Sequence, residues 1–292
     1  MPTVAVNGVE LYYEEAGQGT PLVFSHEFAG DYRSWEPQMR FFSRFYRCIT
    51  YCHRGYPPSD VPKDLDAYSE EHAVEDLFGV VSSLGNGSAH VVGLSMGASA
   101  ALKLGLRHPE VCRSLVIAGA GSGATIPDRF PAECEVVAST IDREGMERFS
   151  LMYSRGPGRQ RFMQKDRRGF DEFVRMLGEH SALGSAMTQR GVQARRTSIL
   201  EIQDQLSSIA LPALIIVGDE DSLCIEPSIV MKRLMPNAGL SMFPKSGHTL
   251  NLEEPALFND TVLDFLTAVE QGRWVPRQEV ADSLLPSDAR PG

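Results

Sequence analysis

Short apolar segments alternate with longer amphipathic segments along most of the chain. Six short segments are predominantly apolar, and continuous runs of this length are typical of strands buried on both faces. These segments cover residues 21–26, 47–53, 89–92, 114–118, 213–217 and 239–243. Longer segments expected to be helical cover residues 69–84, 226–235 and 255–269. This alternation predicts a mostly parallel sheet with helices on both faces.

The N-terminal segment adds two strands of a different kind. An Asn7-Gly8 pair joins two stretches of alternating apolar and polar residues, and this dipeptide favours a tight hairpin turn. The sheet should therefore open with an antiparallel pair. Together with the six apolar segments, this gives an α/β fold with eight strands.

The alternation stops between residues 122 and 197. Phe170, Phe173, Val174 and Leu177 follow the i, i+3, i+4, i+7 spacing of an amphipathic helix, and strand-like runs are missing from this segment. The sequence thus predicts a helical insertion at 122–197, after the sixth strand, between two parts of one core at 1–121 and 198–270. Residues 271–292, rich in Pro, Asp and Ser, are expected to form a loosely held tail.

A serine between two glycines follows the strand at 89–92. The sequence Gly93-Leu94-Ser95-Met96-Gly97 leads into a stretch of small residues that should begin a helix. A serine on such a strand-to-helix turn has its hydroxyl lifted clear of the sheet, and the helix amides point to where an oxyanion would form. Ser95 is therefore the candidate nucleophile.

A serine nucleophile needs a base and a carboxylate that orients the base. Asp219 and Asp221 follow the buried strand at 213–217, and His248 lies in the loop after the strand at 239–243. We expect Asp221 to be the catalytic acid and Asp219 to cap the turn. The chain order of serine, aspartate and histidine is the one found in α/β-hydrolases.

The chain has seven histidines, so the choice of base requires comparison. His26 and His53 each end a strand at the same sheet edge, and a structural or pocket-lining role is expected for them. Four others are expected to be surface or capping residues, namely His72, His90, His108 and His180. His248 has the position that best suits the base.

These motifs together resemble the single-domain, lid-bearing members of the α/β-hydrolase family. The matching positions include the turn at Ser95, the aspartate Asp221 after a strand and Gly247-His248, and the resemblance covers residues 3–270. The resemblance implies that 122–197 is a helical lid. It also implies an oxyanion hole formed by the backbone amides of Phe28 and Met96.

The chain departs from the family pattern after the third strand. Glu27 stands where the family usually has glycine, and a carboxylate near a developing oxyanion would repel it. Either Glu27 turns outward and pairs with Arg33 or Arg54, or it tunes the site and contacts a polar substrate group. The candidate pocket residues are His26, Glu27 and Trp35. A second departure is Cys52, which is expected to pack in the core.

The predicted lid is rich in arginine and lysine, although the whole chain has a net charge of −10. A solvated helix face explains most of these residues. Alternatively, one arginine points into the pocket and binds a substrate carboxylate. The basic residues are Arg155, Arg159, Arg161, Lys165, Arg167, Arg168, Arg190, Arg195 and Arg196.

Composition excludes several other classes. The acidic balance argues against nucleic acid as a partner, and no apolar run is long enough for a membrane span. We expect no cofactor and no metal, because phosphate-binding loops and Cys/His ligand spacings are missing. The five cysteines lack the spacing of disulfide pairs, and we recognise no signal peptide. Both observations favour a cytoplasmic location. Homo-oligomerisation is left open.

The sequence favours a serine hydrolase that cleaves a small carboxylic ester or lactone through an acyl-serine intermediate. Hydrolysis of a carbon–carbon bond in a diketone-like ring-cleavage product is the main alternative, because the same triad can perform it. A ligand-binding protein without activity, and cofactor-free oxygen or peroxide chemistry, also remain open. Dehalogenase and epoxide hydrolase activities are disfavoured, since the families that carry them use an aspartate at the position of Ser95.

Overall fold

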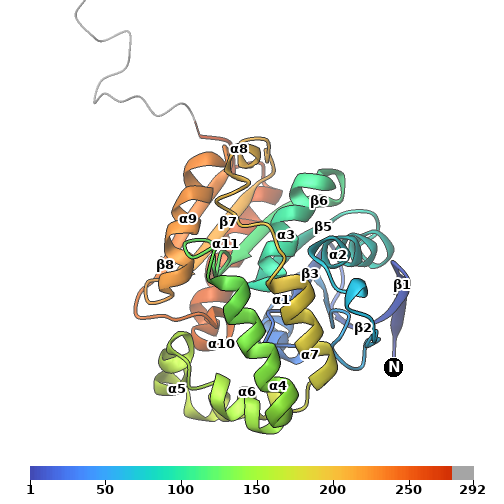
Figure 1. Cartoon of the computed structure of the whole chain (residues 1–292). Helices are drawn as coiled ribbons and strands as arrows, with labels where there is room; N and C mark the ends of the chain where they lie inside the picture. Colours follow the sequence, from blue (N-terminus) through green and yellow to red (C-terminus); the bar gives the residue numbers. More distant parts are fainter. Residues whose placement is uncertain (278–292) are drawn as a thin grey trace, which may run out of the picture.

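The computed structural model describes residues 1–277, and an eight-stranded sheet forms its centre (Figure 1). The strand order is β1-β2-β4-β3-β5-β6-β7-β8. The strands are β1 (Thr3–Val6), β2 (Val9–Ala16), β3 (Pro21–Ser25), β4 (Arg47–Tyr51), β5 (Ala89–Leu94), β6 (Cys112–Ala118), β7 (Ala213–Gly218) and β8 (Ala238–Phe243). The predicted eight-stranded α/β-hydrolase fold is confirmed.

Only the first two strands break the parallel arrangement. β1 and β2 form the predicted hairpin, with Val6 opposite Val9, and β2 runs antiparallel to β4. The other six strands are parallel, so their carboxyl ends lie along one edge of the sheet. β3, β5 and β7 are buried throughout, which explains their continuous apolar sequences.

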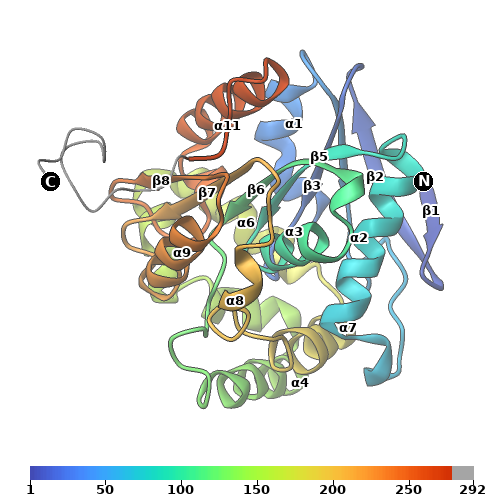
Figure 2. The same ribbon diagram turned by 90° about the horizontal axis from the view of Figure 1, so that it is seen from above.

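Helices cover both faces of the sheet, as Figure 2 shows from above. One face packs against α1 (Glu36–Phe42) and α11 (Pro255–Glu270), and the other against α2 (Glu70–Leu84), α3 (Met96–Arg107) and α9 (Ser222–Leu234). The predicted start of α9 at residue 226 is wrong. The helix begins four residues earlier, directly after Asp221, and Pro227 lies inside it.

A group of helices is inserted between β6 and β7, within the predicted range 122–197 (Figure 1). The predicted amphipathic helix is α6, whose Phe170, Phe173 and Leu177 are buried. The inserted helices are α4 (Phe130–Tyr153), α5 (Gln160–Lys165), α6 (Arg167–Gly178), α7 (Ala182–Thr188) and a π-helical turn at Gln189–Gln193. We call this group the cap.

Shorter elements complete the described chain. Two are short α-helices, α8 (Gln203–Leu206) and α10 (Leu250–Glu253). The 3-10 turns are Tyr32–Trp35, Leu65–Ala67, Pro109–Val111 and Pro157–Arg159. Among residues 1–277, none of the helices combines the length and apolar character that crossing a membrane requires.

The predicted tail at 271–292 is described only as far as residue 277, and the rest lies outside the described residues. Its first part is held against the core. The Trp274 ring packs edge-on against Phe265 with centroids 4.7 Å apart, and its indole Nε1 donates to the carbonyl of Asn237. Trp274 is therefore docked on the core, through an apolar contact that composition alone does not reveal.

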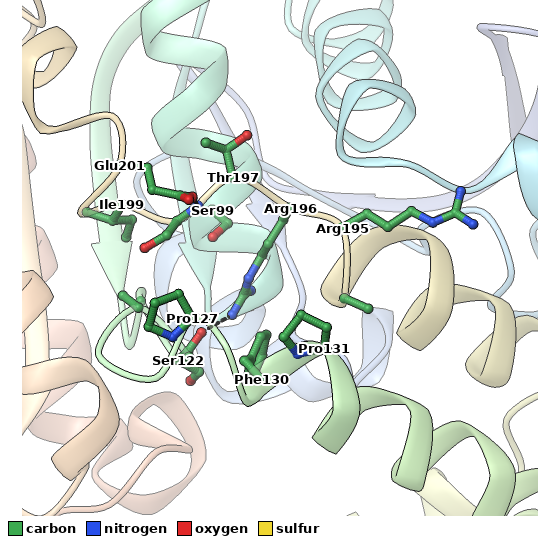
Figure 3. Close-up of a pocket in the computed structure, with 15 residues that line it drawn as sticks. Ser99, Ser122, Pro127, Phe130, Pro131, Arg195, Arg196, Thr197, Ile199 and Glu201 are labelled. Carbon is green, nitrogen blue, oxygen red and sulfur yellow. Dashed lines mark hydrogen bonds between the residues drawn. The ribbon is translucent and has the colours of Figure 1, made fainter.

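Two of the cavities between the core and the cap adjoin each other. One, of about 440 Å³, is lined by Ser95 and His248. The other, of about 500 Å³, lies beside Ser99 and the chain that returns from the cap to the core (Figure 3). Ser122, Phe130 and Arg196 line both cavities, so these residues lie between them.

Candidate active site

Ser95 lies on a strained turn between β5 and α3. Its φ of 54° is in the left-handed region, which non-glycine residues rarely adopt. Glycines permit the tight turn, because a Cβ on Gly97 would lie 2.1 Å from the carbonyl oxygen of Ser25. A Cβ on Gly93 would lie 2.3 Å from the carbonyl oxygen of Gly97. Both glycines are therefore required by close backbone approach, as the motif predicts.

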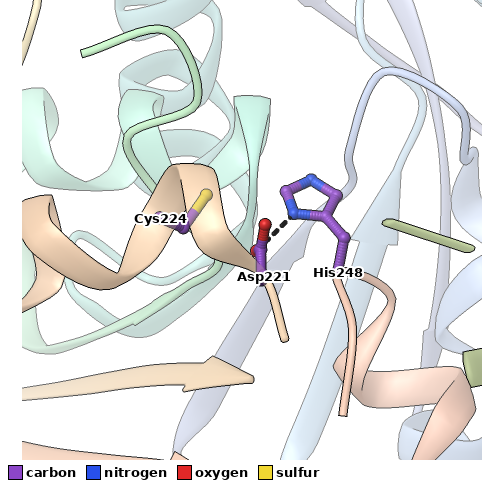
Figure 4. Close-up of side chains that lie close together, drawn as sticks. All are labelled: Asp221, Cys224 and His248. Carbon is purple, nitrogen blue, oxygen red and sulfur yellow. Dashed lines mark hydrogen bonds and ion pairs between the residues drawn. The ribbon is translucent and has the colours of Figure 1, made fainter. Parts of the chain in front are cut away.

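His248 links Ser95 to Asp221. The distance from His248 Nε2 to Ser95 Oγ is 2.9 Å. The distance from His248 Nδ1 to Asp221 Oδ2 is 2.6 Å, and Figure 4 draws this contact as a dashed line. With Nδ1–H donating to the carboxylate, Nε2 is left to accept the hydroxyl proton of Ser95. The structure thus brings the three predicted residues together in the predicted order.

The surroundings of His248 set its charge. Burial acts to lower the pKa of the imidazole, but the carboxylate of Asp221 outweighs this effect and holds the pKa well above its ordinary value. Burial acts to raise the pKa of Asp221, and the paired imidazole brings it below its usual range. Asp221 is therefore suited to stabilise an imidazolium on His248.

Asp219 does not take part in this arrangement. Its Oδ1 accepts a hydrogen bond from the backbone N–H of Ser246 at 3.2 Å, which ties the end of β7 to the loop that carries His248. The expected role of Asp219 in fixing the turn is consistent with this contact.

Cys224 is a neighbour that the sequence analysis did not identify. Its sulfur lies with donor atoms of Asp221 and His248 in a cluster whose atoms are within 4.8 Å of one another (Figure 4). Burial raises the pKa of the thiol, and its Sγ–H donates to the carbonyl of Gly119. Asp221 and His248 already bind each other and the raised pKa keeps the thiol protonated, so this set is poorly suited to hold a metal ion. Position i+3 from Asp221 on α9 was the available signal.

The predicted oxyanion donors lie beside Ser95. Met96 is the first residue of α3, and Phe28 lines the same cavity as the serine. Within residues 1–277, the structure shows no acceptor for either backbone amide. Both amides are therefore available to a bound oxygen, as the resemblance implies.

Glu27 turns into the protein rather than outward, so the expected pairing with Arg33 or Arg54 is wrong. Its carboxylate forms a bidentate ion pair with Arg159 from the cap, and the two side chains are 2% and 4% exposed. Arg33 and Arg54 bind Asp31 and Asp76 instead. The error arose because the sequence does not show which cap residue faces the loop after β3.

The Glu27–Arg159 ion pair is part of a wider link between cap and core. Arg159 also donates to the hydroxyl of Thr249, next to His248. The carbonyl of Gly158 accepts a hydrogen bond from the backbone N–H of His248 at 3.0 Å. The cap therefore fixes the loop that carries the histidine, in addition to covering the cavity.

Two other predicted pocket residues lie behind the site. The described lining of the cavity includes Glu27 but neither His26 nor Trp35, both fully buried. His26 Nδ1–H donates to the carbonyl of Glu27, and burial lowers the pKa of its imidazole to about 4. Trp35 packs against Phe24 in the core. Position near the catalytic edge therefore did not predict access to the cavity.

Two of the remaining four histidines are buried, which their sequence context did not indicate. His72 and His108 lie at helix ends, as expected. His90 and His180 are buried, so a surface role is wrong for them: His90 binds Ser114, and His180 packs against the ring of Tyr56. Cys52 is buried, as expected.

Comparison with known proteins agrees with this fold. A family model described as the alpha/beta hydrolase fold matches residues 20–255. A 2-hydroxy-6-oxononadienedioate/2-hydroxy-6-oxononatrienedioate hydrolase from Burkholderia vietnamiensis is 30% identical over 294 residues, which cover 90% of this chain and 93% of the relative.

Two further proteins extend the comparison. A 3-oxoadipate enol-lactonase from Acinetobacter baylyi is 24% identical over 92% of this chain and 94% of its own. The structure of a thermophilic esterase from Thermogutta terrifontis superposes with a TM-score of 0.80 at 24% identity, covering 91% of this chain and 97% of the esterase. The chain therefore belongs to the α/β-hydrolase fold family of enzymes.

Proposed function

We propose that this protein is a serine hydrolase that cleaves small carboxylic esters or lactones. The observation that carries the proposal is the hydrogen-bonded series Ser95, His248 and Asp221 at the wall of a cavity of about 440 Å³. A hydroxyl with a base at 2.9 Å is the arrangement that activates a serine for attack on a carbonyl. The enol-lactonase name of one relative is in keeping with this substrate class.

The reaction proceeds in two steps. His248 Nε2 takes the proton of Ser95 as Oγ attacks the carbonyl carbon, and the amides of Phe28 and Met96 bind the resulting oxyanion. His248 then returns the proton to the leaving alcohol oxygen, which leaves an acyl-serine. Water attacks this ester with His248 again as base, and the acid product and free Ser95 result.

The first test is hydrolysis of p-nitrophenyl acetate, butyrate and octanoate by the wild-type protein. We expect turnover of the two shorter esters, because a cavity of this size holds a short acyl chain together with the nitrophenyl ring. A fluorophosphonate probe should label the peptide that contains Ser95, as detected by mass spectrometry. A folded protein that neither hydrolyses these esters nor reacts with the probe would contradict the proposal.

The pH dependence provides a second test. A protonated His248 cannot accept the proton of Ser95, so kcat/KM should fall as the pH drops below the pKa of the imidazole. Because the Asp221 carboxylate raises this pKa, the midpoint of the acid limb should lie above pH 6.5, the ordinary value for histidine. The measurement is kcat/KM for the neutral butyrate ester across this pH range. An acid limb centred below pH 6.5 would contradict this interpretation.

Carbon–carbon hydrolysis remains a second candidate, because polar side chains interrupt the mostly apolar lining of the cavity on the cap side. Arg159, Gln189, Gln193 and Arg196 all contribute to its lining. Polar groups in the lining suit a diketone-like substrate, and the relative from Burkholderia vietnamiensis is named for a 2-hydroxy-6-oxo compound. Turnover of such a compound at a rate well above that of the butyrate ester would favour this candidate.

A further inference from the structure

Arg196 lines both cavities at the point where the chain leaves the cap. Figure 3 shows its side chain in the cavity beside Ser99. Its guanidinium lies over the ring of Phe130, 5.0 Å from the ring centroid, and Nη2 donates to the carbonyl of Ser122. Stacking and this hydrogen bond hold the plane of the guanidinium in one orientation. The group is therefore a fixed cation in the wall of the cavity that contains Ser95.

The charges that line this cavity are otherwise paired. Glu27 binds Arg159, and Asp221 binds His248. The remaining carboxylate, Glu133, binds Arg129 at the surface. Within residues 1–277, these pairs leave no acidic group in the cavity lining for Arg196.

Arg196 itself has no ionic partner in the described part of the chain. Among residues 1–277, the structure shows no ion pair to its guanidinium, and its one hydrogen bond goes to a neutral carbonyl. A guanidinium has five N–H donors, so most of these donors lack an acceptor in the described part of the chain. Burial lowers the pKa of this group, but a guanidinium stays protonated in proteins. A partly buried cation with unused donors is suited to bind an anion that enters the cavity.

We propose that Arg196 binds a carboxylate group of the substrate, so that the esters or lactones cleaved at Ser95 also carry a free acid. The substrate class rests on the proposed function, whereas the anion site rests on Arg196 and its surroundings alone. A planar guanidinium matches the two oxygens of a carboxylate. The buried Gln189 and Gln193 line the same cavity and offer amide donors beside it.

The chain contains a matched control in the adjacent residue. Arg195 is exposed, belongs to the same returning chain, and extends away from Arg196 in Figure 3. Removing its charge changes the net charge of the protein by the same amount. Arg195→Gln therefore separates a local effect at the cavity from a general electrostatic effect.

The experiment compares two p-nitrophenyl esters of similar length, the mono-glutarate, which carries a free carboxylate, and the neutral pentanoate. For the wild type we expect a higher kcat/KM with the glutarate ester, and this preference should weaken as salt is added. In Arg196→Gln, KM for the glutarate ester should rise about 10- to 100-fold, which corresponds to a lost charge-assisted hydrogen bond. KM for the pentanoate ester should stay nearly the same, and Arg195→Gln should change neither value.

A purely structural role for Arg196 predicts a different pattern. If the arginine only holds the loop at Ser122 and Phe130, Arg196→Gln will impair both esters equally, and that result would overturn the proposal. Arg196→Lys keeps the charge without the planar fork and should show an intermediate KM for the glutarate ester. If Arg196→Gln does not fold, the test is the ratio of kcat/KM for the glutarate ester to kcat/KM for the pentanoate ester in the wild type. Equal values for the two esters would also overturn the proposal.

Binding without turnover separates this inference from the proposed function. Calorimetry with Ser95→Ala should show that monomethyl glutarate binds more tightly than dimethyl glutarate, and that Arg196→Gln removes the difference. This result would support the anion site even if the wild type hydrolysed no ester. Turnover of neutral esters without any preference for the acid would leave the proposed function intact and overturn the inference. Butylphosphonate is the third ligand, and tighter binding of it than of monomethyl glutarate would overturn the assignment to a carboxylate.

Discussion

Replacing Ser95 with alanine is expected to lower kcat/KM for p-nitrophenyl butyrate by about 10⁴- to 10⁶-fold. The hydroxyl of Ser95 is the nucleophile in the proposed reaction, and its Oγ lies 2.9 Å from His248 Nε2. Without it, only the oxyanion donors and substrate binding contribute to the rate. The measurement is the initial rate of p-nitrophenol release, with circular dichroism to verify that the variant folds.

Ser228→Ala provides the control for Ser95→Ala. Ser228 is fully buried on α9, and its hydroxyl has no hydrogen-bond partner among residues 1–277. Removing an unpartnered buried hydroxyl should leave both the rate and the stability close to the wild type. If Ser95→Ala retained more than about one hundredth of the wild-type rate, the serine would not be the nucleophile, because a triad residue contributes far more than this.

The sequence predicted those features that local signals determine. The turn at Ser95 depends on glycines two residues away on either side, and the positions of Asp221 and His248 follow from the strands that precede them. In a parallel sheet, residues that follow different strands meet at one edge. The triad was therefore recognisable although 153 residues separate Ser95 from His248.

Features that depend on the placement of the cap were not predictable in this way. Glu27 and Arg159 are 132 residues apart, and no periodicity indicates which side of the Pro157–Arg159 turn faces the core. The burial of His180 has the same origin, because it packs on Tyr56 from a different segment. Packing of the cap on the core decides both contacts, and the sequence records this packing only as apolar positions.

Breaking the Glu27–Arg159 ion pair should have the largest effect on stability. Glu27→Leu leaves the guanidinium of Arg159 buried without its counter-ion, and the expected loss is about 3–5 kcal/mol in the free energy of unfolding. Burial acts to lower the pKa of Arg159 and the ion pair raises it, so the arginine keeps its charge in the folded protein. Urea denaturation of the wild type and the variant measures the difference.

Arg161 supplies the matched control for this loss. It lies two residues from Arg159 and pairs with Glu220, but both side chains are about one third exposed. Water solvates the charges of an exposed pair well, so Arg161→Ala should cost much less stability than Glu27→Leu. Equal losses of unfolding free energy in these two variants would show that burial does not make the Glu27–Arg159 pair more important for stability than an exposed pair.

Replacing both partners of the buried pair separates stability from activity. In Glu27→Leu with Arg159→Met no charge is left unpaired, and the double variant should recover most of the stability that Glu27→Leu loses. Its activity should not recover, because the pair joins the loop that carries the Phe28 amide to the cap segment bound to His248 and Thr249. We expect kcat/KM for the butyrate ester to remain at least about 10-fold below the wild type, since misplaced oxyanion donors lower the rate. A double variant with both wild-type stability and wild-type activity would contradict this positioning role, because the pair would then be replaceable by apolar packing alone.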